Sequence, residues 1–170
     1  MAAISTLAVL AVRWPGIAAE GRFSGGTVDG IAFTKSLDGG TTWSAPLQVN
    51  QPPQAQAVSP TLAVAADGII AVGYYDLRND GADTSTLLAN YWLVQSRDGG
   101  NTWSETAIWG PFNYRKAPLA TLGNALFPGD YAGMVGSGKS FLTLFPVTNP
   151  IDGPNASRLY VGTVGTPERR

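Results

Sequence analysis

The sequence has no cysteine and no histidine among its 170 residues, and only 14% of its residues are charged. Without cysteine there are no disulfides, thiolate nucleophiles or cysteine-based zinc sites, and without histidine the commonest metal ligand and the usual general base are missing. Any chemistry must therefore use Asp, Glu, Tyr, Arg, Lys, Ser or Thr, and we expect neither a cofactor nor a metal. The cellular compartment stays open, because cytosolic proteins and disulfide-free secreted proteins both fit this composition.

Long apolar runs and basic clusters are also lacking. No run reaches the roughly 18 apolar residues that span a bilayer. The apolar start over residues 1–12 has neither the positively charged beginning nor a clear cleavage site of a signal peptide, so we expect a strand over residues 5–13. The net charge is −1 and the basic residues are scattered singly. We therefore expect neither a membrane nor a nucleic acid as a partner.

Turn residues and short apolar runs dominate what is present. The 21 Gly and 12 Pro indicate many turns, and the 44% of hydrophobic residues suffice for one ordinary core. No stretch has a helical period, and a Gly-rich loop is expected over residues 15–30. About ten short strands are predicted, over residues 5–13, 31–35, 46–49, 61–65, 69–75, 89–95, 106–109, 130–135, 140–147 and 158–164.

An eight-residue stretch, SLDGGTTW from residue 36, recurs as SRDGGNTW from residue 96, 60 residues later. Asp-Gly-Gly between apolar runs predicts a tight turn. In this turn the Asp carboxylate accepts hydrogen bonds from backbone N–H groups, and Gly adopts a positive φ. The Thr hydroxyl completes the turn, and the Trp ring covers the hairpin. We assign a structural role to Ser36, Asp38, Gly40, Thr42 and Trp43, and to Ser96, Asp98, Gly100, Thr102 and Trp103.

These two stretches resemble the Asp-box, Ser-x-Asp-x-Gly-x-Thr-Trp, of the BNR repeats found in sialidases (neuraminidases) and many other propeller proteins. A looser likeness to exo-α-sialidases extends from residue 22 onward and includes residues 22–26, 74–78 and 127–131. The resemblance implies a β-propeller fold. It does not imply a single activity, because sialidases, other glycosidases and non-enzymatic propellers all carry the box.

The expected fold is all-β, a partial sialidase-like propeller of about two and a half four-stranded antiparallel blades. Residues 1–50 would form an incomplete blade with an Asp-box, residues 51–110 a complete blade with the second box, and residues 111–170 an incomplete blade without one. Closed propellers have 4–8 blades. We therefore expect a C-terminal fragment of a larger protein, or several copies that cover each other's open edges.

Candidate site residues gather at one end of the expected blades. In a blade with strands A to D, the boxes are C–D turns, so they lie opposite the B–C loops. The resemblance implies arginines that clamp a sugar carboxylate, an acid that protonates the leaving oxygen and a tyrosine nucleophile. The candidates are Arg22, Arg78 and Arg115 for substrate binding, Asp76 and Asp130 as acid/base, and Tyr131 as nucleophile.

A purely structural alternative exists for the same residues. Asp76 and Arg78 lie two positions apart and could pair locally, and Asp130 and Tyr131 could tie a buried turn.

A second motif, residues 133–140, satisfies the phosphate-loop pattern G-x-x-x-x-G-K-S. A β-type run containing Pro146 follows it instead of a helix, so we predict a hairpin turn there.

Two functions follow as hypotheses. The first is a sialidase-like glycoside hydrolase that acts on terminal acidic sugars and is inactive as this isolated chain, because a site at a propeller axis draws residues from several blades. The second is a non-catalytic Asp-box propeller that binds glycan or protein. Secretion or display at the cell surface is implied for a parent protein by the resemblance alone.

Overall fold

The computed structural model describes residues 6–18, 27–119, 126, 128–129, 132–148 and 156–166. Within these residues the chain forms ten β-strands and one short 3-10 turn, and no α-helix. The predicted all-β class is confirmed. In the same ranges, the structure contains no helix that is long and apolar enough to cross a bilayer.

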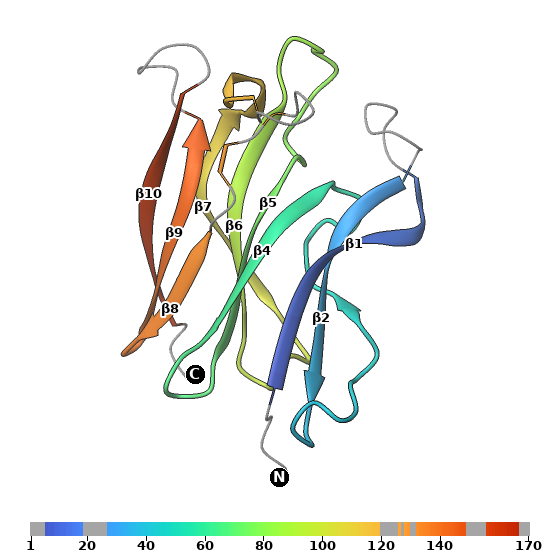
Figure 1. Cartoon of the computed structure of the whole chain (residues 1–170), viewed down its shortest axis with the longest axis vertical. Helices are drawn as coiled ribbons and strands as arrows, with labels where there is room; N and C mark the ends of the chain where they lie inside the picture. Colours follow the sequence, from blue (N-terminus) through green and yellow to red (C-terminus); the bar gives the residue numbers. More distant parts are fainter. Residues whose placement is uncertain are drawn as a thin grey trace.

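The strands form three antiparallel sheets in which neighbours in sequence are neighbours in space (Figure 1). The first sheet contains β1 (Thr6–Ala18), β2 (Thr27–Ser36) and β3 (Leu47–Gln48). The second contains β4 (Ala57–Val64), β5 (Ile70–Asp76), β6 (Leu88–Ser96) and β7 (Ser104–Asn113), followed by the 3-10 turn η1 (Tyr114–Lys116). The third contains β8 (Gly133–Ser137), β9 (Ser140–Thr148) and β10 (Ser157–Gly165).

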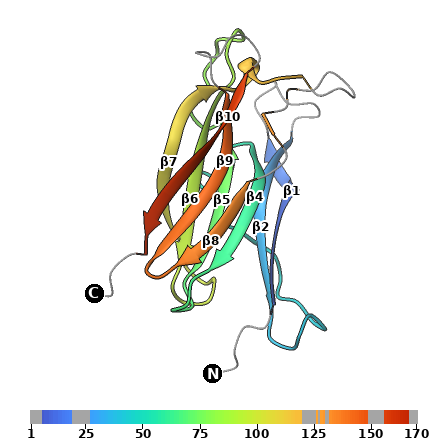
Figure 2. The same ribbon diagram turned by 60° about the vertical axis from the view of Figure 1, so that its left-hand side comes forward.

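The second sheet is the central layer, and the other two pack on its opposite faces (Figures 1 and 2). Ile31 and Phe33 of the first sheet pack against Val72 of the second sheet. On the other face, the ring of Tyr91 stacks on Phe145 with centroids 4.2 Å apart. Full burial of such a side chain contributes about 1.5–3 kcal/mol, so these two layers of contacts hold the three sheets together.

Strand alternation determines which face of the third sheet is buried. Along β9, Phe141, Thr143 and Phe145 are buried toward the second sheet, whereas the intervening Leu142 and Leu144 are exposed. This is the two-residue period of a strand. The outer face of the third sheet is apolar, and its exposed large side chains are Val135, Leu142, Leu144, Leu159 and Val161.

The predicted loop over residues 15–30 is wrong at both ends. β1 continues to Ala18, and β2 already begins at Thr27. The β1–β2 register shifts between Arg13 and Ala18, which lets the strand continue past Pro15, a residue that cannot donate to a regular ladder. The predicted hairpin at residues 133–140 is confirmed, since β8 and β9 pair directly and Gly138 turns the chain with φ +58°.

Candidate functional site

Both Asp-box turns are closed by side-chain hydrogen bonds. In the first box, the Ser36 hydroxyl donates to Asp38 Oδ1 (2.7 Å), which also accepts the Thr42 N–H (2.9 Å). The Thr42 hydroxyl donates to Asp38 Oδ2 (2.7 Å), and Trp43 Nε1 donates to the Gly40 carbonyl (3.1 Å). The second box repeats all four bonds with Ser96, Asp98, Thr102, Trp103 and Gly100. The bonds from the Thr N–H and the Thr hydroxyl are those that the sequence predicts for the turn. The bonds from the Ser hydroxyl and from Trp Nε1 are additional.

The hydrogen bonds keep both box carboxylates ionised. Bonds from Thr42 and Ser36 lower the pKa of Asp38 to about 2, and bonds from Thr102 and Ser96 hold the pKa of Asp98 well below its usual range. In both boxes, the two carboxylate oxygens of the Asp accept hydrogen bonds from residues of the same turn. The geometry therefore supports a structural role for both boxes.

The two boxes differ in their surroundings. Trp43 is 45% exposed, whereas the Trp103 ring packs edge-on against Phe33 of the first sheet, with centroids 5.0 Å apart. Lys35 Nζ donates to the Gly99 carbonyl at 2.6 Å. The second box therefore joins the first two sheets as well as closing a hairpin.

Arg78 lies in a closed network at the opposite end of β5. Its Nε donates to Asp76 Oδ2 (2.6 Å), and its Nη1 and Nη2 donate to the two carboxylate oxygens of Glu105 (2.5 and 2.9 Å). The guanidinium also lies over the ring of Trp92, 3.7 Å from the centroid. This bidentate pair leaves the Arg78 side chain only 14% exposed.

Asp76 is completely buried in this network. Trp92 Nε1 donates to Asp76 Oδ1 at 2.8 Å, and burial raises the pKa of the carboxyl to about 6, although Arg78 opposes the shift. The Tyr74 hydroxyl donates to Glu105, and burial raises the pKa of Tyr74 far above its ordinary value, so that it stays neutral. The structure thus shows the local Asp76–Arg78 pair of the structural alternative.

Sequence reasoning missed Glu105, Tyr74 and Trp92 as members of this network. One signal was available, because Asp76 and Glu105 are the only charged residues within the four strands of the second sheet. An ionised carboxylate that is buried in a sheet needs a cation or hydrogen-bond donors beside it, because burial of an unpaired charge is costly. The alternation of β5 and β6 then places Tyr74 opposite Trp92, beside the guanidinium.

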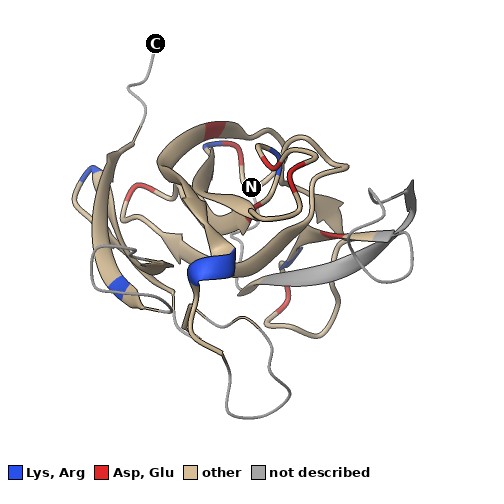
Figure 3. Ribbon diagram, turned by 90° about the horizontal axis from the view of Figure 1, so that it is seen from above, with Lys and Arg blue, Asp and Glu red and all other residues tan. Residues whose placement is uncertain are grey.

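Arg115 lies on η1, at the end of the second sheet that also carries Asp76 and Arg78. Asn113 Oδ1 accepts the N–H groups of Leu87 and Arg115, each at 3.1 Å, and Arg115 Nε donates to the Thr86 carbonyl at 3.2 Å. Arg115 and the neighbouring Lys116 are exposed. Figure 3, which looks down on this end, shows η1 as a basic turn.

The remaining candidates cannot be placed. Arg22, Asp130 and Tyr131 lie outside the described residues. The structure therefore brings Asp76 and Arg78 together and puts Arg115 on a neighbouring segment. Within the described ranges, no three Asp, Glu, His or Cys side chains cluster in a way that could hold a metal ion.

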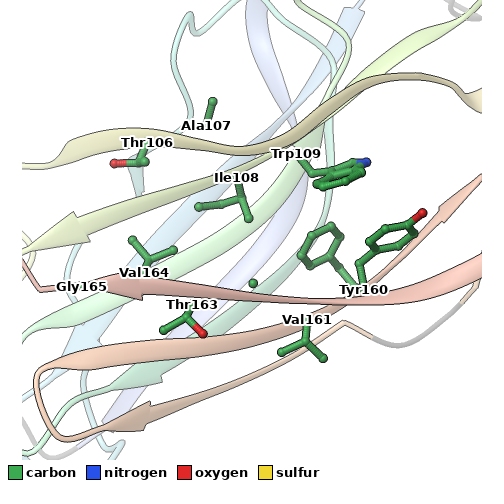
Figure 4. Close-up of a pocket in the computed structure, with 11 residues that line it drawn as sticks. Thr106, Ala107, Ile108, Trp109, Tyr160, Val161, Thr163, Val164 and Gly165 are labelled. Atoms are coloured by element: carbon green, nitrogen blue, oxygen red, sulfur yellow. The ribbon is translucent and has the colours of Figure 1, made fainter.

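A groove that sequence reasoning did not anticipate separates β7 from β10 (Figure 4). Its volume is about 450 Å³. Trp109 is 46% exposed and lies against Tyr160, with ring centroids 4.7 Å apart and planes tilted by 36°. The lining residues are Thr106, Ala107, Ile108, Trp109, Phe145, Tyr160, Val161, Gly162, Thr163, Val164 and Gly165.

Comparison with known proteins adds no family to this description. No protein-family model and no curated protein matches the sequence.

The buried Asp76 predicts a characteristic dependence of stability on pH. Its folded pKa of about 6 lies above the ordinary value of 3.8 for Asp, so the native state binds more protons than the unfolded state between these values. Its contribution to the free energy of unfolding therefore falls as pH rises from about 4 to about 6, by about 3 kcal/mol in total. We expect Asp76→Asn to remove this decline in urea unfolding measured from pH 4 to pH 7.

The matched control is Asp67→Asn, which changes an exposed carboxylate in the β4–β5 turn. It should leave the decline between pH 4 and pH 6 as it is in the wild type. An Asp76→Asn variant that keeps the wild-type slope would contradict a raised pKa at Asp76.

Proposed function

We propose that this chain forms blades of a sialidase-like Asp-box β-propeller, and that it binds an acidic glycan without hydrolysing it. Three features support the fold proposal: the three sheets stack in chain order, neighbouring strands are joined as antiparallel meanders, and the β2–β3 and β6–β7 connections carry turns of the same geometry. Since closed rings have 4–8 blades, further blades or further copies would complete the ring.

The single observation that favours binding over hydrolysis is the closed network around Arg78. An arginine that clamps a sugar carboxylate must offer two donors to it, but Nε, Nη1 and Nη2 of Arg78 already donate to Asp76 and Glu105. A general acid must come within hydrogen-bonding distance of the leaving oxygen. Asp76 has no exposed surface, so it fits a structural role better than a catalytic one.

Arg115 and Lys116 are the described cations that best fit a glycan carboxylate. They are adjacent and exposed on η1, and the Thr86 carbonyl restrains the Arg115 guanidinium through Nε. Two neighbouring cations, one of them a planar guanidinium, suit an anionic sugar. The glycan would therefore lie at the end of the second sheet that is opposite the boxes.

Two assays on the purified 170-residue chain test this proposal. A fluorogenic sialoside should show no turnover, and sialyllactose should bind in calorimetry with an affinity that Arg115→Ala lowers at least fivefold. Arg97→Ala is the matched control, because Arg97 is an exposed arginine of the second box, at the other end of the sheet. Turnover of the sialoside, or equal binding by Arg115→Ala and the wild type, would contradict the proposal.

A further inference from the structure

The end of β7 is joined to the β5–β6 loop by the side chain of one residue, Asn113. Its Oδ1 accepts the Leu87 N–H and the Arg115 N–H, each at 3.1 Å. The Leu87 carbonyl in turn accepts the Tyr114 N–H at 2.7 Å. Asn113 is thus the N-cap of η1 and, at the same time, an acceptor for the loop that faces it.

The loop residue before Leu87 supplies the acceptor for the Arg115 side chain. The Thr86 carbonyl accepts Arg115 Nε at 3.2 Å, and a turn fixes Thr86, whose N–H and hydroxyl both donate to the Asp83 carbonyl. Asn113 Oδ1 therefore fixes the Arg115 backbone and, through Leu87, the acceptor for the guanidinium. Both ends of this side chain are held through the same oxygen.

The restraint on Nε determines how the Arg115 guanidinium can meet a ligand. A guanidinium can bind a carboxylate through Nε and one Nη, or end-on through Nη1 and Nη2. In Arg115 the Nε–H is donated to the Thr86 carbonyl, and Nη1 and Nη2 donate to no residue within the described ranges. The end-on approach is therefore the one that a carboxylate can take without displacing Thr86.

We propose that Asn113 is a positioning residue, which orients the Arg115 guanidinium so that Nη1 and Nη2 together bind a ligand carboxylate end-on. That this carboxylate belongs to a glycan rests on the proposed function, whereas the role of Asn113 in holding Arg115 does not. The two oxygens of a free carboxylate match the two parallel N–H groups of the guanidinium fork. A methyl ester has lost the negative charge, so it should not bind.

The first test needs no ligand and measures the exchange of the Arg115 Nε–Hε proton by ¹⁵N NMR. We expect slower exchange at Arg115 than at Arg97, an exposed arginine whose guanidinium has no hydrogen bond to a described residue. Asn113→Ala should speed the exchange at Arg115 at least threefold, because the Thr86 carbonyl is no longer held in place. Asn113→Asp should keep the wild-type rate, since a carboxylate oxygen can accept the same two N–H groups.

Thr148→Val is the matched control for a merely structural role of Asn113. The Thr148 hydroxyl donates to the Asn113 carbonyl at 3.0 Å, so this substitution removes a hydrogen bond from the same residue and leaves its side chain in place. It should lower the free energy of unfolding without changing the exchange at Arg115. No acceleration in Asn113→Ala, or equal acceleration in Thr148→Val, would overturn the proposal.

The second test adds sialyllactose and its methyl ester in calorimetry. Asn113→Ala should weaken the binding of sialyllactose at least threefold, Thr148→Val should leave it unchanged, and the ester should not bind to the wild type. Equal affinities of Asn113→Ala and the wild type, or equal binding of acid and ester, would overturn the proposal.

The Nη–Hη signals of Arg115 report the end-on geometry in the same samples. Rotation averages these signals in a free guanidinium, and they should become resolved when sialyllactose binds, while the Nε–Hε proton stays protected. Binding that leaves them averaged would also overturn the proposal. If the wild type does not bind sialyllactose at all, the proposed glycan function fails, and the exchange rates without ligand alone decide the role of Asn113.

Discussion

Replacing Arg78 with Met should lower the free energy of unfolding by about 3–5 kcal/mol at pH 8, because it leaves a buried carboxylate without its partner. The Asp76 carboxyl has no exposed surface, and Arg78 is its closest cation, at 2.6 Å. At pH 5 the loss should be smaller, since Asp76, with a pKa of about 6 even beside Arg78, is then mostly neutral. It should not vanish, because the two hydrogen bonds from Arg78 to Glu105 are lost at both pH values. Urea unfolding at both pH values measures the difference.

The matched control for this prediction is Arg115→Met, which removes an exposed guanidinium from η1. Its cost should stay within about 0.5 kcal/mol at both pH values, as is usual for a surface substitution. If Arg78→Met cost no more than this control, or cost the same at pH 5 and pH 8, the guanidinium would not be holding Asp76 in its ionised form.

Replacing Gly100 with Ala should cost about 2–5 kcal/mol, more than the same change at Gly40, its equivalent in the first box. Both glycines have positive φ, +88° and +90°, so both variants suffer the left-handed strain of about 1–2 kcal/mol. At Gly100, a Cβ would also lie 2.3 Å from Cε1 of the buried Phe33, which adds about 1–3 kcal/mol of overpacking.

Gly40→Ala is the internal control for the clash. At that position the nearest heavy atom to a new Cβ is Cζ2 of the exposed Trp43, at 3.9 Å. Thermal and urea unfolding of the two variants should therefore rank Gly100→Ala clearly below Gly40→Ala in stability. Equal losses would mean that the second box does not join the first two sheets.

The local features of this fold could be predicted from the sequence. The hydrogen bonds of each box join residues at most four positions apart, so all of the bonding partners lie within the eight-residue motif. The alternation along β9 likewise indicates the buried face of a strand without knowledge of its neighbours. These two kinds of signal account for the strands and for the turns between them.

The site could not be predicted in the same way. Arg78 and Glu105 are 27 residues apart and meet only because the antiparallel register places the start of β7 beside the Tyr74–Trp92 pair. The sequence therefore left open whether Asp76 and Arg78 pair or catalyse, since both roles need a carboxylate near a guanidinium. The groove depends on how two sheets diverge at β7 and β10, which no local pattern encodes.

The proposed glycan binding requires that Arg115 contacts the ligand and that Arg78 has a structural role only. NMR of the arginine side-chain N–H groups tests this most directly, because each Nε–Hε signal reports its own partner. When N-acetylneuraminic acid is titrated into the ¹⁵N-labelled chain, the Arg115 signal should shift and saturate. The Arg78 signal, held by Asp76, should stay in place. A saturable shift of Arg78, with Arg115 unchanged, would contradict the account and return Asp76 and Arg78 to the role of a ligand-binding pair.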